Sequence, residues 1–235
     1  GVCLAEKGHK VVCIDIDKKK IESLKRGILP IYEPGLDKLL IKNYKKNNLD
    51  FTCDYRSAYK NADVIFIGVG TPEKEDGSAN LDYVYSVCKQ ISEVINKDCL
   101  VVIKSTVPIG TNDKIEEYLR EHVKQNIKVE VASNPEFLSQ GTAVRDTLYA
   151  KRIVIGVESE FAKRILKEVY DVFGQPIIIT NRRSAEMIKY ASNDFLALKI
   201  SFINEIANLC EIVGADIEDV TKGMSYDSRI GKEFL

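Results

Sequence analysis

Short, uninterrupted apolar runs alternate with amphipathic stretches along most of this chain. The runs that predict strands are Val11–Ile16, Ala62–Val69, Cys99–Ile103, Lys128–Ala132, Arg152–Val157 and Pro176–Ile179. The stretches that predict helices are Lys18–Arg26, Leu36–Asn47, Leu81–Ile95, Asn112–Lys124 and Glu160–Val172. Strands without polar alternation are typical of a sheet that helices cover on both faces. The alternation therefore predicts an α/β fold with a Rossmann-like, doubly wound parallel sheet.

The pattern changes from about residue 181 to residue 213, where no strand signal, proline or glycine interrupts the chain. Apolar residues recur there every three or four positions, and a second apolar row runs beside the first. A long helix that is apolar on more than one side must be buried on more than one side. We expect a second domain, or the same helix of another subunit, to cover it. Gly214 predicts the end of this helix, and "ADIEDVTKGM" predicts a short further helix.

The domain division that follows is 1–180 for the sheet domain and 181–235 for the long helix and the start of a second domain. The formal net charge is −1 over 235 residues, so no basic surface argues for nucleic acid or an anionic membrane. The apolar runs are too short to span a bilayer. Six cysteines are scattered without a CxxC pair, and most lie in apolar stretches. They predict free thiols in a reducing cytoplasm and no metal site.

The first residues, "GVCLAEKGHKVVCIDID", read as the tail of a helix followed by a strand that ends in an acidic residue. In a dinucleotide-binding unit these are the end of the first helix and the second strand. Asp15 is then placed to accept hydrogen bonds from the ribose hydroxyls of NAD, and it would repel the extra phosphate of NADP. The alternative is structural, because aspartates often end strands.

Polar side chains follow three predicted strands. Thr71 lies in "VGTPEKEDG" and Thr106 in "KSTVPIGT", and ligands of open parallel sheets bind at such strand ends. The alternative for each threonine is helix capping. The segment "ASNPEFLSQGTAVRD" follows another strand and holds Asn134, Glu136 and Gln140. Its alternative is a capping box between Ser133 and Glu136.

Lys189 and Asn193 are four residues apart on the predicted long helix and therefore share one face. A lysine in apolar surroundings is costly unless it is paired, and such groups mark functional sites. The alternative is a lysine whose ammonium reaches back to solvent.

Taken together, eight stretches of this sequence resemble the nucleotide-sugar dehydrogenases of the UDP-glucose/GDP-mannose dehydrogenase family. They run in family order, cover nearly the whole chain and are "GVCLAEKGHKVVCIDID", "ILPIYEPGLDKLL", "ADVIFIGVGTP", "VVIKSTVPIGT", "SNPEFLSQGTAVRD", "RIVIG", "AEMIKYASNDFLALKISFINEIANLCEIVGAD" and "SYDSRIGKEFL". Each stretch alone is modest, whereas eight in order are highly specific.

The resemblance implies NAD as cofactor, with Asp15 at the adenosine ribose and Lys20 near the same site. Thr71 and Thr106 would lie along the cofactor and the catalytic water, and Thr106 would join the catalytic residues. The long helix would form the core of a homodimer, and Arg229 would reach into the neighbouring subunit's site.

The resemblance also implies a substrate site. Glu136 would serve in acid–base chemistry, and the backbone of Phe137 and Leu138 would hold the substrate. Lys189 would stabilise the developing oxyanion, and Asn193 would anchor substrate and water. The implied reaction is the NAD-dependent oxidation of UDP-glucose to UDP-glucuronate by two hydride transfers, with a cysteine thiolate that captures the aldehyde and passes through a thioester.

Three departures from the family pattern stand out. The phosphate-binding GxGxxG loop would lie before Gly1, and the nucleophilic cysteine and the UDP-binding domain would follow "GKEFL", so we expect this chain by itself to be inactive or nearly so. Gln140 stands where many relatives carry a second glutamate, and an amide cannot act as a base. Glu136 is then the acid–base group that remains.

Other interpretations stay open. The parent protein could oxidise GDP-mannose or a UDP-N-acetylhexosamine, since the domain that reads the sugar is not included. The chain could also be a non-catalytic fragment that dimerises or binds a nucleotide. A third interpretation is a dehydrogenase of the hydroxyacid and 6-phosphogluconate group, which also places a lysine and an asparagine four apart on a long helix; "NPEFL" and "YEPGL" favour the nucleotide-sugar enzymes.

Overall fold

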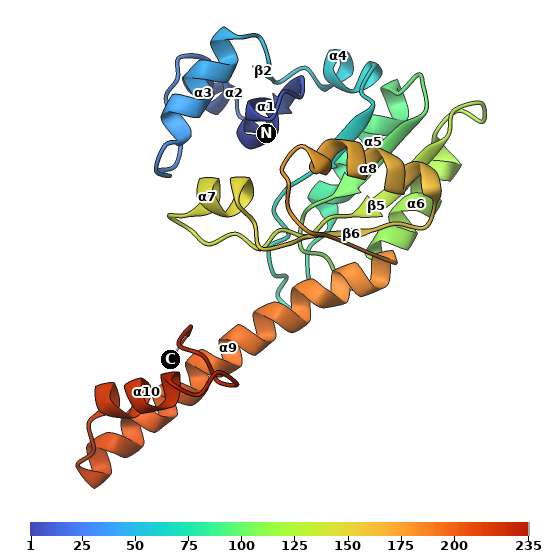
Figure 1. Cartoon of the computed structure of the whole chain (residues 1–235). Helices are drawn as coiled ribbons and strands as arrows, with labels where there is room; N and C mark the ends of the chain where they lie inside the picture. The colour runs from blue at the N-terminus through green and yellow to red at the C-terminus, as the bar shows by residue number, and fades with distance from the viewer. Residues whose placement is uncertain (235) are drawn as a thin grey trace. The chain divides into compact units, whose positions relative to one another are not determined.

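The computed structural model describes residues 1–234, which form two compact units, Gly1–Glu186 and a second unit that begins at Met187. Parallel strands frame the first unit (Figure 1). They are β1 (Val11–Ile14), β2 (Leu49–Thr52), β3 (Val64–Ile67), β4 (Cys99–Ile103), β5 (Val129–Ser133), β6 (Ile153–Gly156) and β7 (Ile177–Thr180). The helices are α1 (Val2–Glu6), α2 (Lys18–Lys25), α3 (Leu36–Lys45), α4 (Tyr55–Lys60), α5 (Asp82–Val94), α6 (Thr111–His122), α7 (Ala143–Leu148), α8 (Glu160–Asp171), α9 (Arg182–Val213) and α10 (Ile217–Ser225).

The strands pair in two sheets, one of order β1-β2 and one of order β3-β4-β5-β6-β7. Neighbouring strands are parallel except at the junction of β5 and β6, where Ser133 and Gly156 form a single antiparallel pair. The expected α/β fold with a Rossmann-like parallel sheet is confirmed. Sequential parallel strands need a crossover between them, and helices supply it here, as α5 does between β3 and β4 and α6 between β4 and β5.

Helices cover both faces of the larger sheet. On one face Ile65, Val101 and Ile103 pack with residues of α5 and α6 such as Ile91 and Ile115. On the other face the alternate strand residues pack with α8, and this second cluster includes Leu100, Val102, Ile155 and Leu166. Every residue of β4 is buried. This two-sided burial is why the strand sequences are continuous apolar runs rather than alternating ones.

A third cluster belongs to the smaller sheet, where Ala5, Ile21, Leu40 and Phe51 bring α1, α2 and α3 onto β1 and β2. The smaller sheet also reaches the main core, because Ile14 at the end of β1 packs against the cluster of α5 and α6. Ile14 therefore links the smaller sheet to the core of the larger one.

All six strands predicted from the sequence are present, and so are the predicted helices, including α9, which ends before Gly214, and α10. Three elements lack a strong sequence signal. Strand β2 is a four-residue edge strand with alternating burial. Helix α4 is a six-residue, largely polar turn capped by Asp54, and α7 has no fully buried residue. Short elements with little apolar surface leave little periodicity to detect.

The second unit consists of α9 from Met187 onward, α10 and the residues that follow. Lys199 on α9 donates hydrogen bonds to the carbonyl oxygens of Ile230 (3.1 Å) and Glu233 (2.6 Å), which tie the last described residues to the helix. Several large apolar side chains of α9 remain exposed, among them Phe195 (61%), Leu198 (63%) and Ile212 (81%). Within this unit, therefore, the helix is apolar beyond what α10 covers.

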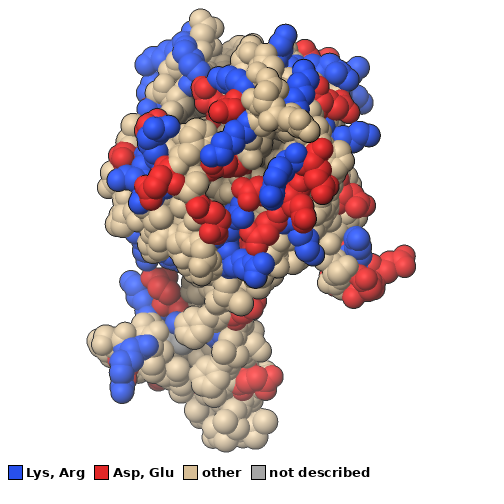
Figure 2. Space-filling model, turned by 90° about the vertical axis from the view of Figure 1, so that its right-hand side faces the viewer, with Lys and Arg blue, Asp and Glu red and all other residues tan. Residues whose placement is uncertain are grey.

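Charges of both signs alternate on the face shown in Figure 2, in keeping with the formal net charge of −1. No single-sign field is visible there that would attract a polyanion. Within residues 1–234, no helix combines the length and the apolar character that crossing a bilayer requires. The six cysteines are free thiols, and Cys88, Cys99 and Cys210 are buried.

Candidate active site

The candidate residues of the first unit lie just beyond the carboxyl ends of β1, β3, β4 and β5. Asp15 follows β1, Thr71 follows β3, Thr106 follows β4 and Glu136 follows β5. The carboxyl ends of parallel strands form the ligand-binding edge of an open α/β sheet. Because β3, β4 and β5 are neighbouring parallel strands, Thr71, Thr106 and Glu136 follow one edge of the larger sheet, whereas Asp15 follows β1 of the smaller sheet.

Asp15 and Lys20 form an ion pair at the end of β1, with the ammonium of Lys20 donating to Asp15 Oδ2. The backbone N–H of Asp17 donates to Asp15 Oδ1 at 3.0 Å. Burial raises the pKa of Asp15, but the hydrogen bonds from Lys20 and Asp17 outweigh it, so the pKa lies below its ordinary value. A half-exposed carboxylate that stays charged is a suitable acceptor for the two hydroxyls of a ribose, so this site fits the adenosine end of NAD.

The turns after β3 and β4 are joined by side-chain hydroxyls. Thr71 Oγ1 donates to the carbonyl oxygen of Thr106 at 2.8 Å, and Ser105 Oγ donates to that of Val69 at 2.6 Å. Neither threonine caps a helix, because Leu81 and Gly110 hold the N-cap positions of α5 and α6. The capping alternative is therefore wrong for both, and hydrogen bonds join the two turns to each other.

Glu136 lies in an irregular segment, 134–142, between β5 and α7. Its Oε2 accepts the backbone N–H of Leu138 at 2.6 Å. No helix begins at Ser133, which is the last residue of β5, so the capping-box alternative is also wrong. Phe137 carries the guanidinium of Arg152 on its ring face at 4.5 Å, and Leu138 is 41% exposed.

The remaining candidates belong to the second unit. Lys189 and Asn193 lie one turn apart on α9, where Lys189 is buried and Asn193 is exposed. Arg229 lies after α10, is exposed, and its guanidinium pairs with Asp227 at 2.6 Å. Burial of the Lys189 side chain argues against the alternative in which its ammonium reaches solvent.

Residues 1–174 match the NAD binding domain of the UDP-glucose/GDP-mannose dehydrogenase family, and residues 183–235 match the central domain of the same family. The chain belongs to this family. The matched NAD binding domain contains Asp15, Thr71, Thr106 and Glu136. The family match also makes the hydroxyacid and 6-phosphogluconate interpretation unnecessary.

Among individual members of the family, a UDP-glucose 6-dehydrogenase of Bacillus subtilis (strain 168) is 53% identical over the whole of this chain, which corresponds to 53% of that protein. A UDP-glucose 6-dehydrogenase of Rhizobium meliloti (strain 1021) is 48% identical, again over the whole chain and 55% of that protein. This chain therefore spans about half the length of the curated relatives it matches.

Solved structures of the family give the same picture. A UDP-glucose dehydrogenase from Pyrobaculum islandicum superposes with a TM-score of 0.95 at 40% identity, over 99% of this chain and 55% of that one. A GDP-mannose dehydrogenase from Pseudomonas aeruginosa superposes with a TM-score of 0.91 at 35% identity, over 96% of this chain and 53% of that one. Both kinds of nucleotide-sugar dehydrogenase thus share the fold of the described residues.

A polar network that the sequence does not reveal positions the start of the Glu136 segment. Asn134 is buried, and its Oδ1 accepts hydrogen bonds from Lys104 Nζ (3.2 Å) and Tyr170 Oη (2.5 Å). Its Nδ2 donates to the carbonyl oxygen of Val154 at 2.8 Å. Burial raises the pKa of Tyr170, which keeps its hydroxyl a donor. Lys104 directly follows the predicted strand Cys99–Ile103, and this position is the one feature of the sequence that could have indicated its role in the network.

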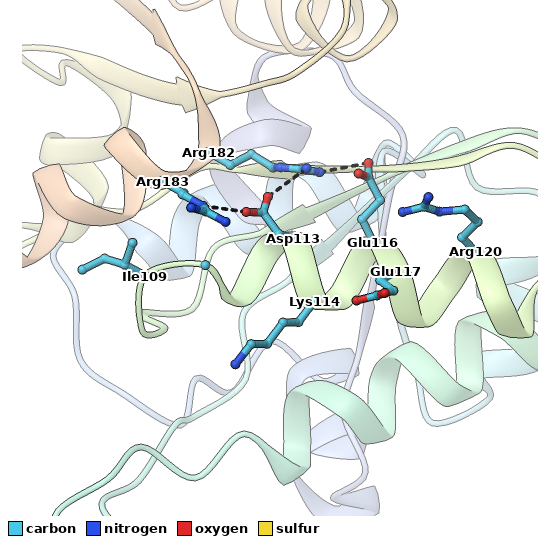
Figure 3. A pocket seen from close by; sticks show the side chains of 9 residues that line it. Ile109, Asp113, Lys114, Glu116, Glu117, Arg120, Arg182 and Arg183 are labelled. Atoms are coloured by element: carbon cyan, nitrogen blue, oxygen red, sulfur yellow. Dashed lines mark hydrogen bonds and ion pairs between the residues drawn. The ribbon is translucent and has the colours of Figure 1, made fainter.

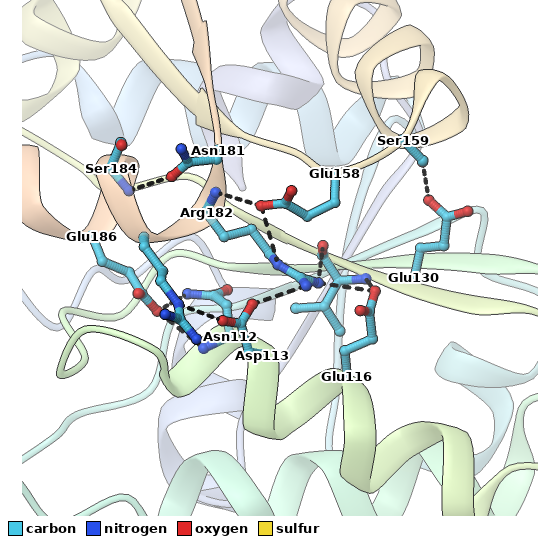
Figure 4. A network of polar contacts seen from close by, with 12 residues as sticks. Asn112, Asp113, Glu116, Glu130, Glu158, Ser159, Asn181, Arg182, Ser184 and Glu186 are labelled. Atoms are coloured by element: carbon cyan, nitrogen blue, oxygen red, sulfur yellow. Dashed lines mark hydrogen bonds and ion pairs between the residues drawn. The ribbon is translucent and has the colours of Figure 1, made fainter.

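A second network surrounds Arg182, at the start of α9 and within the first unit (Figure 4). The buried guanidinium lies 2.9 Å from Asp113, 2.9 Å from Glu116 and 3.8 Å from Glu158, and it donates to the carbonyl oxygen of Val131 at 3.2 Å. Figure 3 shows Asp113 between Arg182 and Arg183. These residues line an open hollow of about 570 Å³. Since acidic and basic groups neutralise one another there, the network is best understood as an anchor for α9.

Glu186 completes that anchor from the first turns of α9. Its buried carboxylate accepts the backbone N–H groups of Gly110 (2.6 Å) and Asn112 (3.0 Å) and the side-chain amide of Asn112 (2.5 Å). The N-cap residue of α6, Gly110, offers no side chain for this purpose. A carboxylate from α9 therefore satisfies the first donors of α6, where negative charge is favoured, and it fixes the helix that follows the Thr106 turn.

Proposed function

We propose that the native-length protein is an NAD-dependent dehydrogenase that oxidises UDP-glucose to UDP-glucuronate. The observation that carries the proposal is the set of polar groups at the strand ends. Asp15, a charged acceptor for ribose hydroxyls, follows β1; the turns after β3 and β4 are joined by the hydroxyl of Thr71; and Glu136 follows β5. The relatives with 47–53% identity named for UDP-glucose support the choice of sugar.

On the cofactor side, Asp15 accepts the adenosine ribose hydroxyls, and Lys20 keeps that carboxylate ionised and oriented. Thr71 and Thr106 line the path of the dinucleotide toward the reacting carbon. NAD+, when bound, supplies the hydride acceptor. Because the hydroxyl of Thr71 donates a hydrogen bond to the carbonyl oxygen of Thr106, we expect the two turns to keep their relative positions while the cofactor enters and leaves.

On the substrate side, Glu136 moves protons, and the backbone of Phe137 and Leu138 holds the nucleotide sugar. The hydrogen bond from the Leu138 N–H to the Glu136 carboxylate (2.6 Å) joins the acid–base group to the backbone that holds the nucleotide sugar. An ionised carboxylate that accepts a backbone hydrogen bond has a fixed orientation, and a fixed orientation is what a general base needs.

The second unit supplies the charge stabilisation. Lys189 places an ammonium in a buried position, where it would stabilise an oxyanion more strongly than in water. Asn193 orients substrate and water. We further propose that α9 forms the core of a homodimer in a reducing cytoplasm, since its exposed apolar residues need a cover, and that Arg229 serves the neighbouring subunit's site.

The test is NADH formation by the native-length protein with UDP-glucose, followed by absorbance, with UDP-glucuronate identified as product. We expect two NADH for each UDP-glucuronate. The variants Glu136→Gln and Lys189→Ala should each lower kcat by about a hundredfold or more, while Lys167→Ala, which changes an exposed side chain of α8, should not. Unchanged kcat in both site variants would refute the assigned roles.

A second candidate function is oxidation of GDP-mannose, and the TM-score of 0.91 to a GDP-mannose dehydrogenase favours it as the rival. Comparing kcat/KM for UDP-glucose, GDP-mannose and UDP-N-acetylglucosamine decides between them. A preference for GDP-mannose would replace the proposed substrate and leave the cofactor site unaffected.

A further inference from the structure

Glu33 is a buried carboxylate in the loop between α2 and α3. Glu33 is only 6% exposed, whereas the adjacent Tyr32 is 86% exposed and Ile31 is 61% exposed. Loops normally expose their charged residues and bury their apolar ones. Burial of a carboxylate is costly unless hydrogen bonds replace its water, so this reversed arrangement requires specific partners.

Its partners are two backbone N–H groups more than a hundred residues away. Gly141 donates to Oε1 at 2.8 Å and Ala143 donates to Oε2 at 3.1 Å. Each carboxylate oxygen thus takes one donor. Ala143 is the first residue of α7, and Thr142, the N-cap residue, makes no capping bond of its own. Glu33 therefore caps α7 from outside, in the place of the missing local cap.

The same stretch is closed by other carboxylates. Asp146 Oδ2 accepts hydrogen bonds from the backbone N–H of Ser139 (3.1 Å) and the hydroxyl of Thr142 (2.7 Å). Glu136 Oε2 accepts one from the backbone N–H of Leu138. Glu136 and Asp146 are local to the segment or to α7. Glu33 instead follows α2, the helix whose first turn carries Lys20 and pairs with Asp15.

We propose that Glu33 is a positioning residue for nucleotide-sugar binding, which rests on the function proposed above. By holding Gly141 and Ala143, it fixes the far end of the segment whose near end is held by Asn134. Phe137 and Leu138 lie between these two fixed points, and their backbone is the part assigned to the substrate. The loop that follows α2, the helix next to the proposed cofactor site, thereby fixes the shape of segment 134–142, which is assigned to the substrate.

Amide hydrogen exchange of the native-length protein tests the geometric part without any activity. In the wild type, Gly141 and Ala143 should be protected although both lie near the surface. In Glu33→Gln one of the two donors faces an amide NH2, so exchange at Gly141 and Ala143 should be about tenfold faster, and the effect should extend to Leu138. Unprotected amides in the wild type, or an effect confined to Gly141 and Ala143, would overturn the proposal.

Steady-state kinetics tests the functional part. Glu33→Gln should raise KM for UDP-glucose about tenfold while KM for NAD and kcat change less than about twofold. Glu22→Gln, on the exposed side of α2, is the matched control and should leave all three unchanged. Equal loss of kcat and of both affinities would indicate a general structural role and overturn the inference. A wild-type protein that is inactive on every nucleotide sugar would instead refute the proposed function. The hydrogen-exchange result at Leu138 would then still test whether Glu33 positions the segment.

Discussion

Lys20 donates its ammonium to the carboxylate of Asp15, across the turn that joins β1 to α2. The pair has two consequences. The carboxylate is oriented before any cofactor binds, and the hydrogen bonds from Lys20 and Asp17 hold its pKa below the ordinary value although burial raises it. The lysine, in turn, is occupied, so its charge is not offered to the 2′-phosphate of NADP. We therefore expect cofactor preference to depend on the pair rather than on Asp15 alone.

Replacing Asp15 by alanine should lower the affinity for NADH about tenfold, since a charged acceptor for the ribose hydroxyls is lost. The same change frees Lys20, whose ammonium can then pair with the 2′-phosphate of NADPH. The ratio of NADPH to NADH affinity should rise accordingly. Fluorescence titration of the native-length protein with both reduced cofactors measures it.

Asp17→Asn is the matched control for this prediction. Asp17 accepts the N–H groups of Lys19 (2.9 Å) and Lys20 (3.2 Å) as the N-cap of α2, and asparagine fills that position equally well. Its cofactor preference should stay that of the wild type. A parallel loss of NADH and NADPH affinity in Asp15→Ala would mean that the pair does not determine preference.

The sheet could be predicted because its strands are buried on both faces. A run such as the one around Val101 leaves little alternative to a central parallel strand. Strand β2 and helix α7 escaped because both are short: β2 has four residues with alternating burial, and α7 has six residues, none fully buried. Helix α7 also depends on a distant partner, Glu33. A bond between positions more than a hundred residues apart has no local signature.

The site shows the same division. Asp15, Thr71 and Thr106 are readable because they follow strong strands. Asn134 lies in a segment that the sequence marks as unusual, yet its partners Lys104 and Tyr170 come from other elements. The capping alternatives for Thr71 and Glu136 failed because no helix begins near either residue: Thr71 bonds to the carbonyl oxygen of Thr106 in the next turn, and Glu136 accepts the N–H of Leu138 in its own segment.

Arg182→Met should destabilise the first unit by about 3 kcal/mol, because the change leaves acidic groups around Arg182 without their common partner. The estimate is at the low end for buried ion pairs because Asp113 and Glu116 retain partial access to water, with side chains 32% and 25% exposed. Urea denaturation monitored by circular dichroism gives the free energy of unfolding.

Arg183→Met provides the comparison for Arg182. Arg183 pairs with the same Asp113 at 2.8 Å, but its side chain is 70% exposed. Exposed pairs contribute about 0–1 kcal/mol, so this variant should be close to the wild type. If the two variants lose equal stability, burial is not what gives the Arg182 network its strength.

Alkaline pH should destabilise the folded chain through its buried thiols. Burial raises the pKa of Cys88 and of Cys99 from 9.0 to about 12. The folded state thus keeps protons that the unfolded state gives up above pH 9.0, so the stabilisation is complete below that pH and is lost as pH rises toward about 12. The free energy of unfolding should fall over this interval, and less steeply in the double variant Cys88→Ala/Cys99→Ala.

Alkylation with iodoacetamide gives an independent check on the thiols. At pH 8 the folded chain should leave Cys88 and Cys99 unmodified, whereas urea-unfolded chain should react at both, since only the thiolate is the nucleophile. Modification of either residue in the folded protein, at a rate near that of the unfolded chain, would contradict the assigned burial.

Gly156→Ala should be among the most damaging small substitutions in the chain. A Cβ at this position would lie 2.6 Å from Ala185 Cβ, 2.8 Å from Arg182 Cα and 2.9 Å from the carbonyl oxygen of Asn181. Two of these neighbours are backbone atoms at the start of α9, so β6 and the helix must move apart. Overpacking of this kind costs about 3 kcal/mol, measurable by urea denaturation. Gly223→Ala in α10, where a Cβ meets nothing within 4 Å, should instead gain up to about 1 kcal/mol; equal effects at both glycines would mean that the close approach at Gly156 is not what requires glycine there.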